Sequence, residues 1–93
     1  MNRSELVLYV AEATSLSKPD AQKAVDAVFE GITETLRQGN EARFLGFGSF
    51  AVQHSAAREG RNPRTGEKLQ IAASCRPVFK AGKEFKDAVA SLA

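Results

Sequence analysis

The chain has 93 residues, of which 43% are hydrophobic and 26% are charged. This composition is typical of one folded domain and is too apolar for a disordered chain. Folding of so short a chain buries only about 60 to 65% of its unfolded surface, so a partner chain would add burial. A single cysteine, Cys75, excludes an internal disulfide, and the first residues do not resemble a signal peptide. No apolar run reaches the roughly 18 residues of a membrane span, and we expect a soluble, cytoplasmic protein.

Charge is distributed unevenly along the chain, although the net charge is only +2. Residues 1–42 hold 4 basic and 7 acidic side chains, whereas residues 43–93 hold 9 basic and 4 acidic ones. The two halves therefore have net charges of −3 and +5. This division indicates that only the second half is suited to meet a polyanion.

Two helices are predicted in the acidic half. Asn2 precedes Glu5 by three residues, as in a reciprocal cap, and apolar residues then recur at helical spacing to about Ala13. A second start follows, with Ser17 as the cap and Pro19 in the first turn, where a missing N–H costs nothing. We therefore expect a helical pair joined by a short turn.

The second helix is predicted to run for about twenty residues to the stop signal Gly39-Asn40. One face is an apolar stripe: Ala21, Ala24, Val25, Val28, Phe29, Ile32 and Leu36. The opposite face is mostly acidic: Asp20, Asp26, Glu30 and Glu34 against Lys23 and Arg37. A helix with this outer face would repel DNA phosphates.

Strands are predicted after Gly39. Two short apolar stretches, 42–45 and 49–52, flank Gly46-Phe47-Gly48 and are typical of strands joined by a tight turn. Alternation continues the second strand toward Arg58, and residues 69–75 alternate again as the return strand of a long hairpin.

The remaining elements complete an α+β fold. Pro77 is predicted to end the regular pairing or to lie at a sheet edge. A short helix after Gly82 is indicated by the spacing of Phe85, Ala88, Val89 and Leu92. The fold class is α+β, with two N-terminal helices, a three-stranded antiparallel sheet with a long β-ribbon arm, and a short C-terminal helix.

The hairpin has no large apolar side chain between Val52 and Leu69. It cannot form its own core, so it projects into solvent or onto a partner. A two-stranded ribbon fits a DNA groove, where Arg or Asn reads groove width and A·T content. Pro63, rigid and without an N–H, is a candidate wedge between base pairs. The simpler alternative is a solvated turn, but a hairpin this long is marginal by itself, which favours a binding role.

Three motifs resemble those of the bacterial histone-like HU family, which includes integration host factor. They are Gly46-Phe47-Gly48-Ser49-Phe50, then Gly60-Arg61-Asn62-Pro63-Arg64-Thr65-Gly66, then Pro77-Val78-Phe79-Lys80-Ala81-Gly82-Lys83. The resemblance covers nearly the whole chain. It implies one domain, residues 1–93, that forms an intertwined dimer with a body (1–53 and 76–93) and a β-ribbon arm (about 54–75).

The same resemblance implies a role for individual residues. Pro63 would be the wedge, and apolar wedges that kink DNA are described for this family itself. The arm would hold the minor groove with Arg58, Arg61, Asn62, Pro63, Arg64, Thr65 and Lys68. The body would meet phosphates with Arg3, Lys80, Lys83 and Lys86, although the last three, spaced by three, also fit the solvated face of one short helix. The dimer core would contain Phe29, Phe44, Phe47, Phe50 and Phe79.

Catalysis and cofactors are not expected. Gly46-Phe47-Gly48 lacks the third glycine and the following helix of a phosphate-binding loop. His54 and Cys75 are each the only residue of their kind, so a metal site or a cysteine nucleophile would rest on one of each. We therefore predict no enzyme activity, no metal and no cofactor.

Three alternative functions stay open at the level of sequence. A helix-turn-helix reader would place the acidic second helix against DNA. A protein-interaction module would use the hairpin without DNA. A metal-dependent nuclease would need converging carboxylates, whereas Glu59 and Glu67 stand among arginines.

The resemblance instead implies an architectural, nucleoid-associated protein that bends and compacts duplex DNA through the minor groove. Bent, nicked or distorted duplexes would be preferred, with little sequence specificity. A homodimer is expected, and a heterodimer with a related chain stays open.

Overall fold

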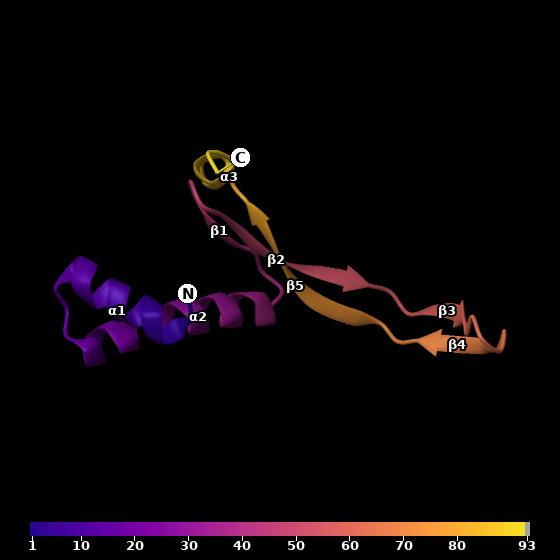
Figure 1. Cartoon of the computed structure of the whole chain (residues 1–93). Helices are drawn as coiled ribbons and strands as arrows, with labels where there is room; N and C mark the ends of the chain where they lie inside the picture. The colour runs from indigo at the N-terminus through magenta and orange to yellow at the C-terminus, as the bar shows by residue number, and fades with distance from the viewer. Residues whose placement is uncertain (93) are drawn as a thin grey trace.

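The computed structural model describes residues 1–92 and has the α+β fold that the sequence predicts (Figure 1). A helical pair lies at one side, a sheet that ends in a third helix rises beside it, and a narrow arm extends away from both. In chain order the elements are α1 (Arg3–Thr14), α2 (Lys18–Arg37), β1 (Ala42–Phe44), β2 (Gly48–Ser55), β3 (Arg58–Arg61), β4 (Lys68–Ile71), β5 (Ser74–Ala81) and α3 (Lys83–Ala90).

Both predicted helix starts are confirmed. The Asn2 side chain accepts a hydrogen bond from the Glu5 backbone N–H at 2.9 Å, and the Ser17 hydroxyl accepts one from Asp20 N–H at 3.3 Å. Each cap satisfies a donor that has no partner inside the helix. Ser15 adopts a left-handed conformation, with φ 59°, at the end of α1. The two helices bury a small core of Val7, Ala11, Ala21 and Val25.

The sheet has the strand order β1-β2-β5, and all its pairs are antiparallel. The turn between β1 and β2 places Gly46 at φ 82°, a conformation that favours glycine. β1 ends at Phe44, so Leu45, which was predicted to close the strand, belongs to the exposed turn. At Gly48 the neighbouring strand is so close that an added Cβ would lie 2.5 Å from the Lys80 carbonyl oxygen.

Pro77 lies inside β5, opposite Val52, and pairing continues beyond it to Ala81. The prediction that Pro77 ends the pairing is therefore wrong, and the alternative, an edge position, is confirmed. β5 is an outer strand of the sheet, where the missing N–H of proline does not break a ladder.

The arm consists of two ladders. β2 and β5 stay paired out to Ser55 and Ser74, and β3 and β4 then pair from Arg58 with Ile71 to Arg61 with Lys68. The prediction of one continuous return strand over 69–75 is thus wrong in detail. The strand is interrupted at residues 72–73, opposite a second interruption at residues 56–57. The chain extends over 60 × 34 × 26 Å, so the arm dominates its shape (Figure 1).

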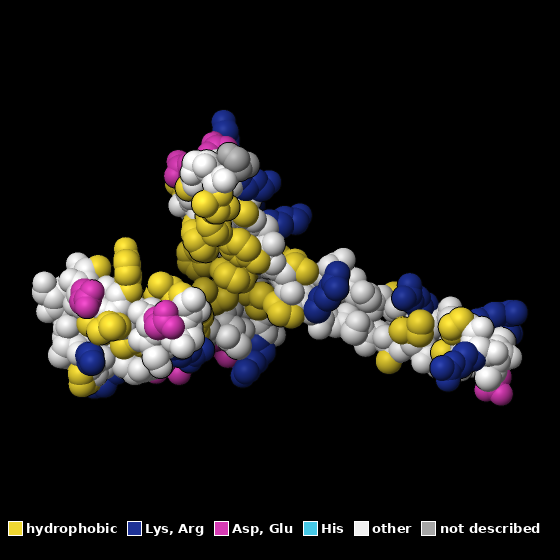
Figure 2. All heavy atoms as spheres, viewed as in Figure 1, with side chains coloured by type: hydrophobic (Ala, Val, Ile, Leu, Met, Phe, Trp, Pro, Cys, Tyr) yellow, Lys and Arg dark blue, Asp and Glu magenta, His cyan; other side chains and the backbone are white. Residues whose placement is uncertain are grey.

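Most large apolar side chains stay partly exposed in the single chain. Hydrophobic side chains gather between the helical pair and the sheet (Figure 2), where α2, β2 and β5 border an open apolar groove of about 440 Å³. Phe44, Phe47 and Phe79 remain 41%, 46% and 40% exposed. α3 ends at Ala90, so Leu92, predicted to complete its apolar stripe, lies beyond the helix and is exposed.

Candidate nucleic-acid interface

The tip of the arm is a turn that is stabilised by hydrogen bonds among its own residues. The Asn62 backbone N–H donates to the Glu67 carbonyl at 2.9 Å, and Gly66 N–H donates to the Asn62 carbonyl at 2.8 Å. The Asn62 side-chain oxygen also accepts from Arg64 N–H at 2.9 Å, which closes a local turn around Pro63. Pro63 is consequently presented, exposed, at the far end of the arm.

Exposed cations surround this tip. Arg58 and Arg61 lie on β3, Arg64 in the turn and Lys68 on β4. Arg61 and Lys68 are direct cross-strand partners, so their side chains share one face of the ribbon. Within residues 1–92 the ion pairs are Arg3–Asp26, Arg37–Glu34 and Arg43–Glu41, and none of them involves a cation of the arm. The arm therefore presents positive charge to a ligand.

A second basic surface lies on the sheet and includes a residue that the sequence predictions missed. Arg76 pairs with Gln53 across β2 and β5, and its guanidinium donates two hydrogen bonds to the Gln53 side-chain oxygen at 3.1 and 2.8 Å. Lys80 lies on the same face, four residues along β5. Small or short side chains occupy much of the rest of this face: Ser49, Ala51, Ser55, Ser74 and Val78.

The alternation of side chains along β5 would have predicted that Arg76 shares a face of the sheet with Lys80. Cys75, Pro77 and Phe79 take one face of the strand, so residues 76 and 80 must take the other. The sequence prediction named Lys80, Lys83 and Lys86 instead, which are spaced by three residues. That spacing does not describe one helical face, because Lys80 lies in β5 and only Lys83 and Lys86 lie in α3.

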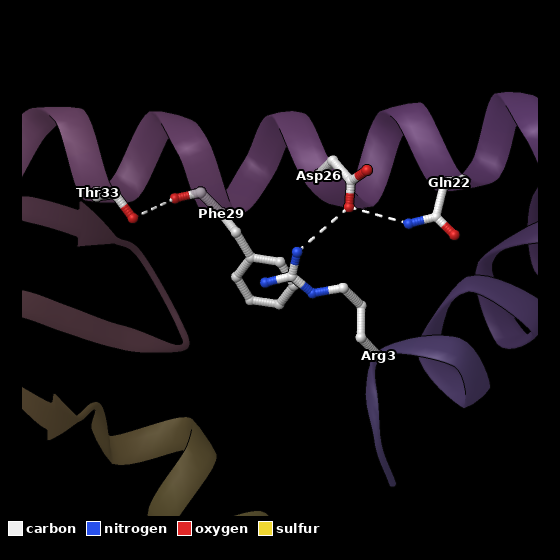
Figure 3. A network of polar contacts seen from close by, with 5 residues as sticks. All are labelled: Arg3, Gln22, Asp26, Phe29 and Thr33. Atoms are coloured by element: carbon white, nitrogen blue, oxygen red, sulfur yellow. Dashed lines mark hydrogen bonds and ion pairs between the residues drawn. The ribbon is translucent and has the colours of Figure 1, made fainter.

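Arg3, predicted to meet phosphate, has partners inside the chain (Figure 3). Its Nη1 atom lies 3.4 Å from Oδ1 of Asp26, which also accepts from Gln22 Nε2 at 3.0 Å. The guanidinium carbon is 4.7 Å from the centre of the Phe29 ring, within the range of a cation–π contact. Because the Arg3 side chain is still 59% exposed, it is also open to a ligand.

His54 and Cys75, which the sequence leaves far apart, are cross-strand partners at the start of the arm. The Cys75 Sγ atom lies 3.2 Å from His54 Nδ1, and the cysteine is exposed. No group of three His, Cys, Asp or Glu side chains suited to a metal ion occurs among residues 1–92.

Four of the five phenylalanines predicted for a dimer core form one cluster on the sheet, together with Phe85 of α3. Phe47 stacks on Phe85 with ring centres 4.7 Å apart, and Phe50 lies 4.7 Å from Phe79. Phe44 meets Phe50 edge-on at 6.3 Å. Phe29 is separate from this cluster and lies under Arg3 (Figure 3).

Comparison with known proteins agrees with this architecture. The family model of bacterial DNA-binding proteins matches residues 1–90. The DNA-binding protein HU of Geobacillus stearothermophilus is 58% identical over 89 residues, which cover 96% of this chain and 99% of the relative. DNA-binding protein HU 1 of Bacillus subtilis is 54% identical, with coverages of 97% and 98%.

Solved structures give the same result. A cocrystal structure of Anabaena HU with DNA has a TM-score of 0.84 and 46% identity, and it covers 97% of this chain and 98% of that one. HU from Thermotoga maritima has a TM-score of 0.67 and 30% identity, with coverages of 96% and 98%. The fold and the basic arm thus define a histone-like DNA-binding protein without catalytic activity. The chain belongs to the HU family of bacterial DNA-binding proteins.

None of the helices within residues 1–92 is long and apolar enough to cross a membrane.

Proposed function

We propose that two identical copies of this chain form an intertwined dimer that holds duplex DNA between two arms and bends it. The observation that carries the proposal is the arm itself, a two-stranded ribbon without a hydrophobic core that ends in an exposed proline. None of the ion pairs formed within residues 1–92 involves an arginine or lysine of this arm. The body is taken as residues 1–53 and 76–93, and the arm as about 54–75. A cocrystal structure of Anabaena HU with DNA supports DNA as the ligand.

The exposed apolar surface supports a dimer. The groove between α2 and the sheet is lined by Ile32, Leu36, Phe50, Val52 and Pro77, among others. Surface of this kind is ordinarily covered in a stable protein. A second identical chain would cover the groove and the aromatic cluster, and it would supply a second arm to the same duplex.

Each part of the basic surface has a separate task. In the arm, Arg58, Arg61, Asn62, Arg64, Thr65 and Lys68 hold the minor groove, and Pro63 enters between base pairs and kinks the duplex. In the body, Arg3, Lys80, Lys83 and Lys86 neutralise phosphates, and Arg76 joins them because it shares a face with Lys80. Phosphate contacts position the protein but carry no sequence information.

Low sequence specificity follows from this division of tasks, because groove width and ease of bending decide where the arms bind. Duplexes that are already bent or nicked cost less to deform and are preferred. Many copies acting along a chromosome compact and stabilise it, which makes the protein a nucleoid component of the bacterial cytoplasm.

Binding to linear and nicked duplexes across a salt series tests the proposal, with the mass in solution measured on the same sample. We expect a dimer, tighter binding to the nicked duplex, and a log–log salt slope of about −0.9 per phosphate contacted. A monomeric protein, or binding that does not respond to salt, would contradict the proposal.

A further inference from the structure

The distal ribbon formed by β3 and β4 has two chemically different faces. Directly opposed residues of an antiparallel pair project to the same side. Arg58 opposes Ile71 and Gly60 opposes Leu69, which defines an apolar face, whereas the other face carries Glu59, Arg61, Lys68 and Gln70.

The apolar face of the distal ribbon is exposed. Leu69 is 45% exposed and Ile71 39%, and the two alternate along β4 with Lys68 and Gln70. Figure 2 shows hydrophobic side chains among the lysines and arginines of the arm. Branched apolar side chains in a solvated ribbon indicate a surface that is covered when the arm meets its partner.

Gly60 gives this face its shape. A Cβ atom added at Gly60 would lie 3.0 Å from the Ile71 Cδ1 atom, so the Ile71 side chain extends over the glycine. The face is therefore a low apolar strip, made by Leu69 and Ile71 across Gly60. Arg58, the cross-strand partner of Ile71, lies on the same face. This strip is too small for a stable protein–protein interface, which buries at least about 1,000 Å².

The charges of the ribbon also distinguish its faces. Glu59, the one carboxylate within β3 and β4, lies on the face opposite Leu69 and Ile71. Turning the Glu59 face toward DNA would bring Arg61 and Lys68 to the phosphates, but also a carboxylate. Turning the apolar face toward DNA brings Arg58 and no carboxylate, at the same net charge of +1.

We propose that the arm lies in the minor groove with its apolar face inward, and that Leu69 and Ile71 pack on the deoxyribose C–H groups of the groove walls. This inference rests on the proposed function and assigns the orientation of the ribbon. Arg58 then reaches a phosphate beside the strip, while Arg61 and Lys68, on the outer face, extend around the ribbon edges toward the rims of the groove. Contacts to sugars are independent of base sequence.

Apolar packing and phosphate pairing respond differently to salt and temperature, and this difference provides the test. Burial of apolar surface makes the heat capacity change of binding more negative, whereas each phosphate contact adds to the salt slope. The double variant Leu69→Thr/Ile71→Thr removes apolar surface and keeps residues that favour strands. Gln70→Thr, between the same two positions on the opposite face, is the matched control.

The full-length protein and both variants are titrated with a nicked duplex over a salt series, and calorimetry gives the heat capacity change. We expect Leu69→Thr/Ile71→Thr to bind roughly tenfold more weakly at every salt concentration, with an unchanged slope and a less negative heat capacity change. Gln70→Thr is expected to bind within about twofold of the parent. Leu69→Val/Ile71→Val, which keeps an apolar strip, is expected to retain most of the affinity.

Equal binding by Leu69→Thr/Ile71→Thr and the parent would overturn the inference and leave the proposed function intact. A similar loss in Gln70→Thr would also overturn it, because the arm as a whole and not one face would then be responsible. A flatter salt slope in the double variant would assign these positions to phosphate contacts instead. Failure of the parent itself to bind the nicked duplex would remove the proposed function, so the two failures are distinguishable.

Discussion

The Arg3 guanidinium lies 3.4 Å from the Asp26 carboxylate and joins the start of α1 to the middle of α2. Phe29 and Gln22 complete the network, through the cation–π contact and a hydrogen bond to the same carboxylate oxygen. The arginine that we propose to neutralise a DNA phosphate is thus held by a carboxylate of its own chain. Under this proposal, Asp26 competes with DNA for Arg3.

Asp26→Asn should release Arg3 to DNA. We expect tighter binding and a salt slope steeper by up to about 0.9, since one more phosphate contact forms. The free energy of unfolding should fall by less than about 1 kcal/mol, because the pair is partly exposed. Glu12→Gln, which changes the net charge equally on exposed α1 surface, controls for the overall charge. An unchanged slope and affinity in Asp26→Asn would show that Asp26 does not compete with DNA for Arg3.

Pro63→Ala tests the wedge. Binding to a linear duplex should be retained, but the bend should be smaller and the preference for nicked DNA should be lost, because alanine is too small to hold two base pairs apart. Fluorescence energy transfer between labelled duplex ends measures the bend. Gln70→Ala, on β4 of the same arm and outside the residues assigned to DNA, is the control. Parent-like bending by Pro63→Ala would exclude the wedge.

Arg76→Gln tests the basic surface on the sheet. Loss of one phosphate contact should reduce the magnitude of the salt slope by about 0.9 and weaken binding equally on all sequences. Arg37→Gln is a suitable control, because Arg37 pairs with Glu34 on the same helix. If both variants change the slope alike, the effect belongs to total charge and not to the Arg76 position.

Phe79→Ala tests the aromatic cluster. Phe79 lies within 4.7 to 6.1 Å of the rings of Phe47, Phe50 and Phe85, and removal of a packed ring costs about 3 to 5 kcal/mol. We expect a lower unfolding temperature and dissociation of the dimer at micromolar concentration in sedimentation equilibrium. Phe79→Leu should lose much less, and a stable Phe79→Ala dimer would place the interface elsewhere.

Two glycine substitutions separate close packing from helix propensity. Gly48→Ala would place a Cβ 2.5 Å from the Lys80 carbonyl oxygen, so it should destabilise the fold by about 1 to 3 kcal/mol. At Gly31, inside α2, an added Cβ would have no atom within 4 Å. Gly31→Ala should therefore stabilise the fold by about 0.5 to 1 kcal/mol, because alanine favours the helix more than glycine does. Urea unfolding measures both, and a neutral Gly48→Ala would show that β2 and β5 can separate locally.

Sequence alone determined the features that depend on neighbouring residues. Each helix cap, at Asn2 and at Ser17, is a hydrogen bond to a residue only three positions further along the chain. The turn around Pro63 closes through Asn62 and Gly66. The projecting arm was also predicted from local sequence, because a segment without large apolar residues cannot pack into a hydrophobic core and therefore extends away from the body.

Only the tertiary structure decided which distant residues meet. The register of β2 and β5 places Arg76 on Gln53 and His54 beside Cys75, and the register of β3 and β4 separates Leu69 and Ile71 from Glu59. Packing of α1 on α2 brings Arg3 to Asp26, 23 residues away. A shift of one residue in a strand would exchange its faces, so these contacts depend on long-range pairing that no local pattern specifies.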